Sequence, residues 1–265
     1  PLGIDKNMPA RFLLPLIDQK AASGFVNASL ALDQARAVKD IQEQELMRKA
    51  SHLNDMAMAE ITHFFKEGGT ETDLAEQLKK IYSDLGADGL SFEPLFAFGS
   101  NAASGHHWPD DTRLKPGDCI LVDIGCTWEG YCSDMTRTFF YKNVTQHQQE
   151  VYHTVLKANE EAEKAVTPGI PLSSLDQIAR GIITDKGYGS AFTHRLGHFI
   201  GLEDHEFGDV SSASADRAVP GNIFSIEPGV YLENDMGVRV EDLVLVTDHG
   251  HEILNHFSKG LTVID

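Results

Sequence analysis

Four carboxylates occur in or beside apolar stretches of this sequence, where an uncompensated charge would be costly. Glu227 ends an apolar run just before a Pro-Gly pair, and Glu241 is surrounded by the apolar residues of segment 238–246. Asp123 and Asp134 lie in β-like runs on either side of the sequence CTWEGYC. Burying a carboxylate costs several kcal/mol unless the group is paired or binds a metal. The four acids therefore point to bound cations.

The runs around Asp123 and Asp134 predict a β-hairpin. If its turn is centred between Trp128 and Glu129, the two aspartates oppose each other directly, with their Cβ atoms about 5 Å apart. Like charges in this position require something positive between them. A bulge at Gly130 would shift the register by one residue and send the side chains to opposite faces. The expected chemistry favours the opposed register.

Two aspartates from this hairpin and two glutamates from other strands can converge on one cavity. Arg239 and Glu241 should share one face of their strand because strand side chains alternate. Four carboxylates balance two divalent cations, and bridging carboxylates hold such ions roughly 3.5–4 Å apart. His194, His198 and His205 could supply an imidazole, and the absence of an HExxH motif argues against a zincin. Taken singly, each acid or histidine could equally be an edge, turn or surface residue.

The composition limits the partners. The 265 residues carry a formal net charge of -18, which argues against nucleic acid and anionic membrane surfaces. No apolar run approaches the roughly 20 residues that span a bilayer, and no signal peptide is visible. The three cysteines form no CxxC pair, which suits reduced thiols in the cytoplasm.

The chain alternates helical and β-rich stretches. Apolar periodicity predicts a long helix over residues 33–69 and a second one over 70–86 that begins with a capping box. Two more helices are expected at 145–166 and 172–186, and the chain is mostly β from residue 191 onward. The order of a helix pair, a hairpin, a second helix pair and a β-rich end indicates an α+β domain with a weak internal duplication.

The acidic residues occur in motifs that resemble the pita-bread metallopeptidases, which include methionine aminopeptidase, aminopeptidase P and prolidase. The motifs are LVDIG with Asp123, SDMTRTF with Asp134, HRLGHFIGLEDHE with His198, SIEPGVY with Glu227, and GVRVEDLVLVT with Glu241. All five positions hold the family's ligand type in the family's order, and the resemblance covers about residues 38–262. It implies two pseudo-two-fold halves, in which helices cover a curved antiparallel sheet.

The resemblance also implies the ligand set. Asp123, Asp134 and Glu241 would hold one metal, and Asp134, His198, Glu227 and Glu241 the other. Asp134 and Glu241 would bridge the two ions. Mn²⁺ is the first choice by resemblance to prolidases, and Co²⁺, Zn²⁺ or Fe²⁺ suit the same ligand types.

Two further histidines match positions that face the substrate in the family. His106 and His107 are both candidates for the family's loop histidine. The spacing to Pro109 and to Gly117-Asp118 favours His106, which would position the scissile amide or donate to it. His205 matches the second substrate-facing histidine and would stabilise the oxyanion.

Glu227 and Arg239 complete the expected catalytic set. Glu227 would relay a proton from the attacking water to the leaving amine. Arg239 would orient a carboxylate, or form a plain ion pair with Glu241 or Glu227.

The resemblance is strongest to prolidase and aminopeptidase P, because an arginine precedes the bridging glutamate by two residues. Residues 1–32 look like the remnant of an amino-terminal domain, and residues 33–265 form the catalytic domain. We expect an Xaa-Pro dipeptidase acting on small peptides, cytoplasmic, and a homodimer when full length. Aminopeptidase P activity on longer peptides is the main alternative. Methionine aminopeptidase and a non-catalytic pita-bread binding protein rank lower, because such binding proteins typically have replaced ligands.

Overall fold

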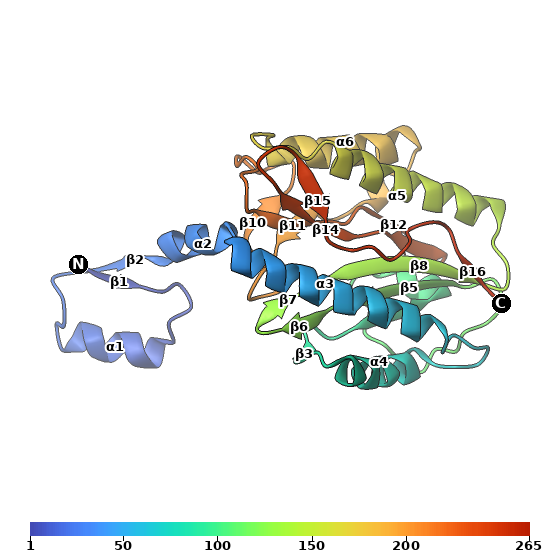
Figure 1. The fold of residues 1–265 in the computed structure, drawn as a ribbon, viewed down its shortest axis with the longest axis horizontal. Coiled ribbons are helices and arrows are strands. Elements are labelled where there is room, and N and C mark those ends of the chain that lie inside the picture. The colour runs from blue at the N-terminus through green and yellow to red at the C-terminus, as the bar shows by residue number, and fades with distance from the viewer.

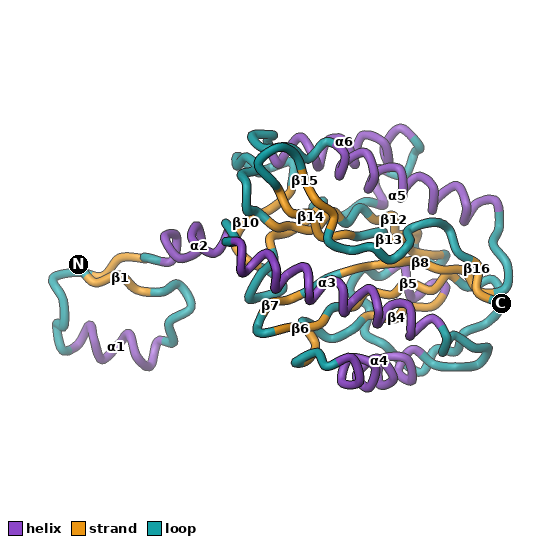
Figure 2. Tube along the Cα trace, viewed as in Figure 1, coloured by secondary structure: helices purple, strands orange, loops and turns teal.

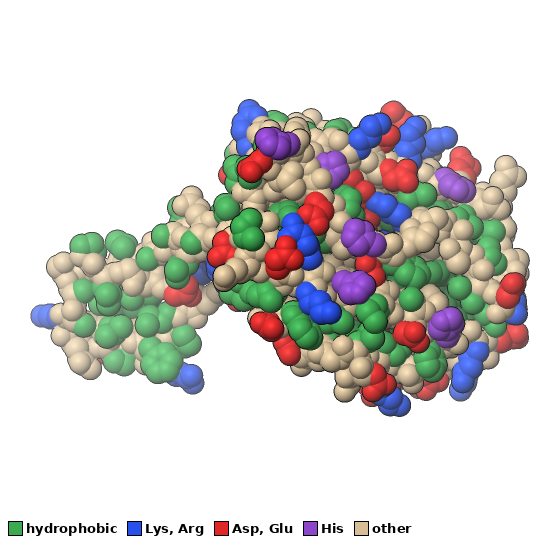
Figure 3. Space-filling view, in the orientation of Figure 1, with side chains coloured by type: hydrophobic (Ala, Val, Ile, Leu, Met, Phe, Trp, Pro, Cys, Tyr) green, Lys and Arg blue, Asp and Glu red, His purple; other side chains and the backbone are tan.

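The computed structural model describes all 265 residues, as a compact body with an N-terminal arm (Figure 1). The arm is built from two short parallel strands and two helices: β1 (Leu2–Ile4), α1 (Ala10–Asp18), β2 (Phe25–Asn27) and α2 (Ser29–Ala37). No residue of α1 is buried, and apolar side chains are frequent on the arm in Figure 3. That the arm is the remnant of a further domain stays a prediction.

The first half of the body begins with α3 (Ile41–Thr62) and α4 (Glu71–Leu85). Asp40 and Thr70 cap these helices with capping boxes, so the predicted start of the second helix is confirmed. The single helix expected over residues 33–69 is wrong. Val38 has an extended backbone, and the side chain of Asp40 accepts hydrogen bonds from Gln42 N and Glu43 N, so a new helix begins there.

The strands of this half form two small sheets. One has the order β16-β8-β5-β4 and the other the order β3-β6-β7. Their bounds are β3 (Gly89–Leu90), β4 (Leu95–Phe98), β5 (Cys119–Ile124), β6 (Cys126–Trp128), β7 (Tyr131–Cys132), β8 (Met135–Tyr141) and β16 (Val263–Ile264), with the 3₁₀ turn η1 at Gly99–Ala103.

The predicted hairpin register is wrong by two residues. Asp123 pairs with Thr136 rather than Asp134, because the turn is centred between Glu129 and Gly130. Both turn residues have positive φ, 47° and 85°, as a two-residue type I′ turn requires. A shift of two preserves the alternation of side chains, so the Asp123 and Asp134 positions still belong to the same face.

The second half repeats the helix pair and the strands. Its five-stranded sheet has the order β10-β9-β11-β14-β15, and β12 pairs with β13. The elements are α5 (Gln146–Lys164), α6 (Leu172–Asp185), η2 (Gly189–Ala191), β9 (Gly197–Phe199), β10 (Glu206–Val210), β11 (Ile223–Ile226), β12 (Gly229–Leu232), β13 (Met236–Arg239), β14 (Asp242–Val246) and β15 (His251–Ile253).

The helices enclose the sheets from two sides. Figures 1 and 2 show α5 and α6 together above the strands and α4 below them, with α3 crossing the near face. One apolar cluster of 29 residues packs α5 and α6 on the strands, and one of 20 residues does the same for α3 and α4. A fully buried Leu, Ile or Phe contributes about 1.5–3 kcal/mol, so these clusters hold the strand ends that carry the acids in place. None of the helices combines the length and the apolar character needed to cross a bilayer.

Candidate active site

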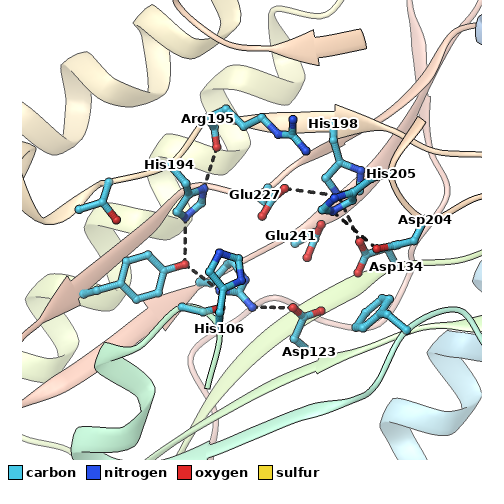
Figure 4. A pocket seen from close by; sticks show the side chains of 15 residues that line it. His106, Asp123, Asp134, His194, Arg195, His198, Asp204, His205, Glu227 and Glu241 are labelled. Atoms are coloured by element: carbon cyan, nitrogen blue, oxygen red, sulfur yellow. Dashed lines mark hydrogen bonds and ion pairs between the residues drawn. The ribbon is translucent and has the colours of Figure 1, made fainter. Parts of the chain in front are cut away.

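A cavity of about 670 Å³ lies where the strands of the two halves meet, and its walls are strongly polar (Figure 4). Only two of its fifteen lining residues are hydrophobic. All five predicted metal ligands and both predicted catalytic histidines line it: Asp123, Asp134, His198, Glu227, Glu241, His106 and His205. Arg239 lines it as well, so the predicted metal ligands and catalytic residues all lie in this cavity, whereas His107, the alternative loop histidine, does not.

Asp134, His198 and Glu241 form the tightest group in the cavity. One ligand atom from each lies within 4.8 Å of the others, and all three residues are buried. His198 Nε2 is 3.4 Å from Asp134 Oδ2 and 3.5 Å from Glu227 Oε1. An imidazole nitrogen facing carboxylate oxygens at such distances is a donor set typical of a borderline divalent cation.

The carboxylates of this cavity carry buried oxygen atoms without any hydrogen-bond partner. They are Asp123 Oδ1, Asp134 Oδ1 and Glu241 Oε1, and Asp204 Oδ1 shares the property. Buried polar atoms normally have partners, so such atoms call for an explanation. Three of the four belong to predicted ligands, and the donor set therefore fits bound metal ions.

Burial and the charges of neighbouring acids raise the pKa values of Asp134, Glu227 and Glu241. Burial, followed by the charges of Glu241 and Asp123, raises the pKa of Asp134 well above its ordinary value. Burial, followed by the charges of Glu227 and Asp123, does the same for Glu241. Burial also raises the pKa of Glu227 to about 7, against the opposing effect of Arg239. Without cations, the ionised carboxylates would repel one another in this cavity.

His198 is held with its Nε2 atom toward the acids. Its Nδ1 lies 3.2 Å from the carbonyl oxygen of Phe199, an acceptor, so Nδ1 carries the hydrogen and Nε2 is free to bind a metal. Burial, followed by the charge of His205, lowers the pKa of His198 to about 3, which keeps the ring neutral. The preceding Gly197 permits this approach, because a Cβ atom there would lie 1.8 Å from the carbonyl oxygen of Ser225.

Glu227 is fixed by its neighbours at the end of β11. The hydroxyl of Ser225 donates to Glu227 Oε1 at 3.1 Å and also accepts a hydrogen bond from His198 N. Pro228 follows Glu227 and cannot donate to a strand ladder, so the strand ends here and the carboxylate points into the cavity.

Arg239 pairs with Asp123 rather than with Glu241 or Glu227, so the plain ion pair expected from the sequence has a different partner. Its Nη2 lies 2.5 Å from Asp123 Oδ2, and its Nε donates to Thr136 Oγ1 at 2.9 Å. Thr136 Oγ1 in turn donates to Glu241 Oε2 at 2.7 Å. Arg239 thus orients two of the predicted ligands, one directly and one through a hydroxyl.

The structure separates the two loop histidines. His106 lines the cavity, whereas His107 turns away and lies 2.6 Å from Glu71 Oε2. The ring of His205 lies on the other side of the cavity, 4.0 Å from that of His198 between centroids, and is exposed enough to meet a ligand. His106 and His205 therefore frame the cavity from two different loops.

The predicted ligand and catalytic sets leave out seven of the fifteen lining residues, among them Tyr231, Asp204 and His194, which the sequence offered only as one possible imidazole. The hydroxyl of Tyr231 accepts a hydrogen bond from Arg239 Nη1 at 2.7 Å and lies 2.9 Å from His194 Nε2. Burial and the nearby Arg239 lower the pKa of His194 to about 4, which keeps the ring neutral. Its Nδ1 donates to the carbonyl oxygen of Arg195 at 2.7 Å, so its Nε2 accepts from the tyrosine. His194 stands four residues before His198 in one motif, and that spacing was the signal available in the sequence.

Comparison with known proteins also identifies the chain as a metallopeptidase. Residues 45–248 match the model of metallopeptidase family M24. An uncharacterized peptidase of Staphylococcus aureus (strain MW2) is 41% identical over 244 residues, which cover 92% of this chain and 70% of that protein.

Two solved structures extend the comparison. The prolidase of Pyrococcus horikoshii OT3 superimposes with a TM-score of 0.96 at 33% identity, covering 98% of this chain and 75% of the prolidase. An X-Pro aminopeptidase of Thermotoga maritima MSB8 gives a TM-score of 0.92 at 32% identity, covering 97% of this chain and 73% of the aminopeptidase.

Proposed function

Because this chain belongs to metallopeptidase family M24 and has its pita-bread fold, we propose that it is an Xaa-Pro dipeptidase. The reaction is hydrolysis of the peptide bond that precedes proline. The observation that carries the proposal is the polar cavity in which Asp134, His198 and Glu241 converge while His106 and His205 face the same space. The likeness to the Pyrococcus horikoshii prolidase supports the choice of substrate.

Two divalent metal ions are the expected cofactor. Asp123, Asp134 and Glu241 would hold one ion, and Asp134, His198, Glu227 and Glu241 the other, with Asp134 and Glu241 shared between them. When bound, such ions lower the pKa of water toward neutrality and polarise a carbonyl. We propose Mn²⁺ as the physiological ion, and Co²⁺, Zn²⁺ and Fe²⁺ suit the same ligands.

The side chains of the chain itself provide proton transfer and orientation. Glu227 takes a proton from the attacking water and delivers it to the nitrogen of the leaving amine. His205 donates a hydrogen bond to the oxygen of the tetrahedral intermediate, and His106 holds the scissile amide. Arg239 keeps the carboxylates of Asp123 and, through Thr136, Glu241 in fixed orientations.

Proline at the second position explains why such an enzyme is needed. The Xaa-Pro amide has no N–H, so proteases that bind that group cannot recognise it. A cavity that acts through carboxylates and imidazoles on the carbonyl side avoids this requirement. The second candidate is an Xaa-Pro aminopeptidase acting on longer peptides, favoured by the Thermotoga maritima neighbour.

The setting of the protein is part of the proposal. The three cysteines are free and buried, which suits a reducing compartment, and we propose the cytoplasm. Apolar side chains on the arm, including Phe12 and Leu14 at more than half exposed, favour a homodimer in the full-length protein.

Hydrolysis of three peptides tests the proposal. The protein is stripped of metal, supplied with Mn²⁺ and assayed on Ala-Pro, Ala-Pro-Ala and Met-Ala-Ser. Cleavage of Ala-Pro alone is the expected result. Cleavage of the proline tripeptide would identify an aminopeptidase P, and cleavage of the Met peptide a methionine aminopeptidase. If Mn²⁺ binds and none of the peptides is cleaved, the dipeptidase proposal is wrong. Glu227→Gln, which cannot carry the proton, is the inactive control.

A further inference from the structure

Glu71 is a fully buried carboxylate outside the active-site cavity, at the first residue of α4. Its Oε1 accepts hydrogen bonds from Phe98 N at 2.7 Å and Asn101 Nδ2 at 3.0 Å. Its Oε2 accepts from Asp110 N at 3.1 Å and lies 2.6 Å from His107 Nε2. Four donors compensate the burial of this charge, and they come from β4, η1 and the loop that follows it.

The cluster of Glu71, His107 and Asp110 has the residue types of a metal site, but its atoms are already satisfied. Neither oxygen of Glu71 lacks a partner, unlike the carboxylates of the main cavity. Because a carboxylate only accepts, His107 Nε2 must carry a hydrogen and therefore cannot bind a metal through that atom. Asn101 Nδ2 donates hydrogen bonds to Glu71 Oε1 and to Thr112 Oγ1. The cluster is a hydrogen-bonded anchor.

The loop 104–110 is attached at two places. Glu71 binds His107 and Asp110, and residues of the active site contact Gly105. The carbonyl oxygen of Gly105 lies 3.4 Å from Arg239 Nη1, and the Tyr231 ring lies against Gly105. His106 stands between Gly105 and His107 and faces the cavity in Figure 4. The His106 imidazole makes no hydrogen bond to the protein, so its position depends on its two neighbours.

We propose that Glu71 and His107 are positioning residues that fix the loop so that His106 faces the substrate. The inference rests on the proposed function, in which His106 holds the scissile amide. A displacement of about 1 Å in a substrate-positioning group can reduce a rate 10²-fold. Releasing His107 from Glu71 leaves the segment between Gly105 and Asp110 without its side-chain attachment, because the remaining contacts lie at Gly105 and at Asp110 N, and His106 then samples orientations that do not meet the amide.

The first test substitutes the anchor and measures Ala-Pro hydrolysis. In His107→Ala the hydrogen bond to Glu71 is lost, and we expect kcat to fall roughly 10- to 100-fold with unchanged metal content. In His107→Gln the amide nitrogen can take the place of Nε2, so activity should be largely restored. Glu71→Gln should resemble His107→Ala. Glu76→Gln, the same substitution at an exposed position of α4, should behave as wild type.

A second readout does not depend on activity. Trp108 follows His107, is 71% exposed, and is one of two tryptophans in the chain. In a Trp128→Phe background the fluorescence anisotropy of Trp108 reports the motion of the loop. We expect a lower anisotropy after His107→Ala or Glu71→Gln and no change after Glu76→Gln.

The outcomes separate the two proposals. Wild-type protein that leaves Ala-Pro intact contradicts the dipeptidase function, and the anisotropy then still decides whether the anchor holds the loop. Unchanged anisotropy in His107→Ala overturns the inference, as do equal losses of kcat in the alanine and glutamine variants. Loss of metal from Glu71→Gln would overturn it too, because the effect would then act through the metal ligands.

Discussion

The ionised carboxylates of the cavity need positively charged partners, either a cationic side chain or bound metal ions. Asp134 and Glu241 are both buried, and burial together with the charges of neighbouring acids raises the pKa of each. Arg239 offsets part of this charge by pairing with Asp123. The remaining unpartnered oxygens point to the place where cations belong.

His205 offers a test of the division between metal binding and catalysis. The residue lines the cavity beside His198 but is not among the predicted ligands. We expect His205→Ala to lower kcat for Ala-Pro roughly 10²-fold or more, as the loss of an oxyanion donor does, while the metal content stays at the wild-type level.

The control is His249→Ala, at an exposed histidine outside the cavity, which should leave kcat unchanged. An effect of His205→Ala on KM alone would contradict the assigned role, and a loss of metal would make His205 a ligand.

At the level of single residues, the sequence could predict which acids and histidines line the cavity, except for Asp204, and it gave His194 no definite role. Each of them lies in a motif whose residue types and order are specific. The partner of Arg239 could not be predicted, because the hairpin register decides which acid lies within its reach. The role of His194 could not be predicted, because it depends on Tyr231, which lies 37 positions further along the chain.

Among the elements, the β6–β7 hairpin shows how a local turn sets the geometry of the site. The turn residues Glu129 and Gly130 both have positive φ, and the resulting register pairs Asp123 with Thr136. Thr136 is the hydroxyl that connects Arg239 to Glu241. A turn at the edge of the molecule thereby determines which side chains meet in the cavity.

Two glycine-to-alanine substitutions should have opposite effects on stability. Gly130 has a φ of 85°, and a Cβ atom there would make only an ordinary contact with Leu202 Cδ2 at 3.9 Å, so Gly130→Ala should cost roughly 1–2 kcal/mol in backbone strain alone. Gly181 lies inside α6, with open space around it and without a positive φ, so Gly181→Ala should add about 0.5–1 kcal/mol.

Urea unfolding of both variants and of wild type measures the difference. Because both positions gain the same methyl group without a clash, the sign depends on the backbone conformation alone. Stabilisation by Gly130→Ala would mean that the turn does not have the type I′ geometry.

The sequence could predict the helices better than the turns. Four helical stretches were expected in the body, and α4, α5 and α6 occur close to the predicted ranges. The break between α2 and α3 was missed because the apolar pattern continues across it, whereas the cap at Asp40 is a local hydrogen-bonding effect. The turn centre was missed because Glu129 is an uncommon choice for a positive φ.

For the whole molecule, the important fact is that the site belongs to both halves. Asp123 and Asp134 come from the first half, whereas His198, Glu227 and Glu241 come from the second. The buried guanidinium of Arg137 crosses the same boundary by donating to the Glu241 carbonyl and to Asp242. Metal ions bound by all five residues would connect the halves in addition to the apolar core.

The arm attaches to this body through a small ionic cluster. Arg36 and Lys39 both donate to Glu206, whose side chain is nearly buried. Glu206 directly follows His205, so the position of the arm and that of the cavity wall are coupled. The apolar side chains of the arm are exposed in this chain (Figure 3). The structure therefore does not show what they contact, and the role of the arm remains a prediction from the resemblance.

Because the five predicted ligands come from both halves of the body, metal removal should destabilise the whole fold. A ligand present at 100 times its Kd stabilises the native state by about 2.7 kcal/mol, and 1 kcal/mol corresponds to roughly 2–4 °C in Tm at this size. We expect a loss of roughly 5–10 °C when wild-type protein is stripped of metal, measured by calorimetry, and recovery on adding Mn²⁺.

Asp134→Asn makes this test specific. Asparagine is always neutral, whereas burial and neighbouring acids oppose the ionisation of Asp134 on folding and raise its pKa, so at neutral pH the metal-free variant should melt above metal-free wild type. Mn²⁺ should then raise its Tm less than it raises that of wild type, because a shared ligand is lost. If Mn²⁺ stabilised the variant as strongly as wild type, Asp134 would not be a metal ligand. If the metal-free variant melted lower than metal-free wild type, repulsion among the acids would not limit the stability of the empty site.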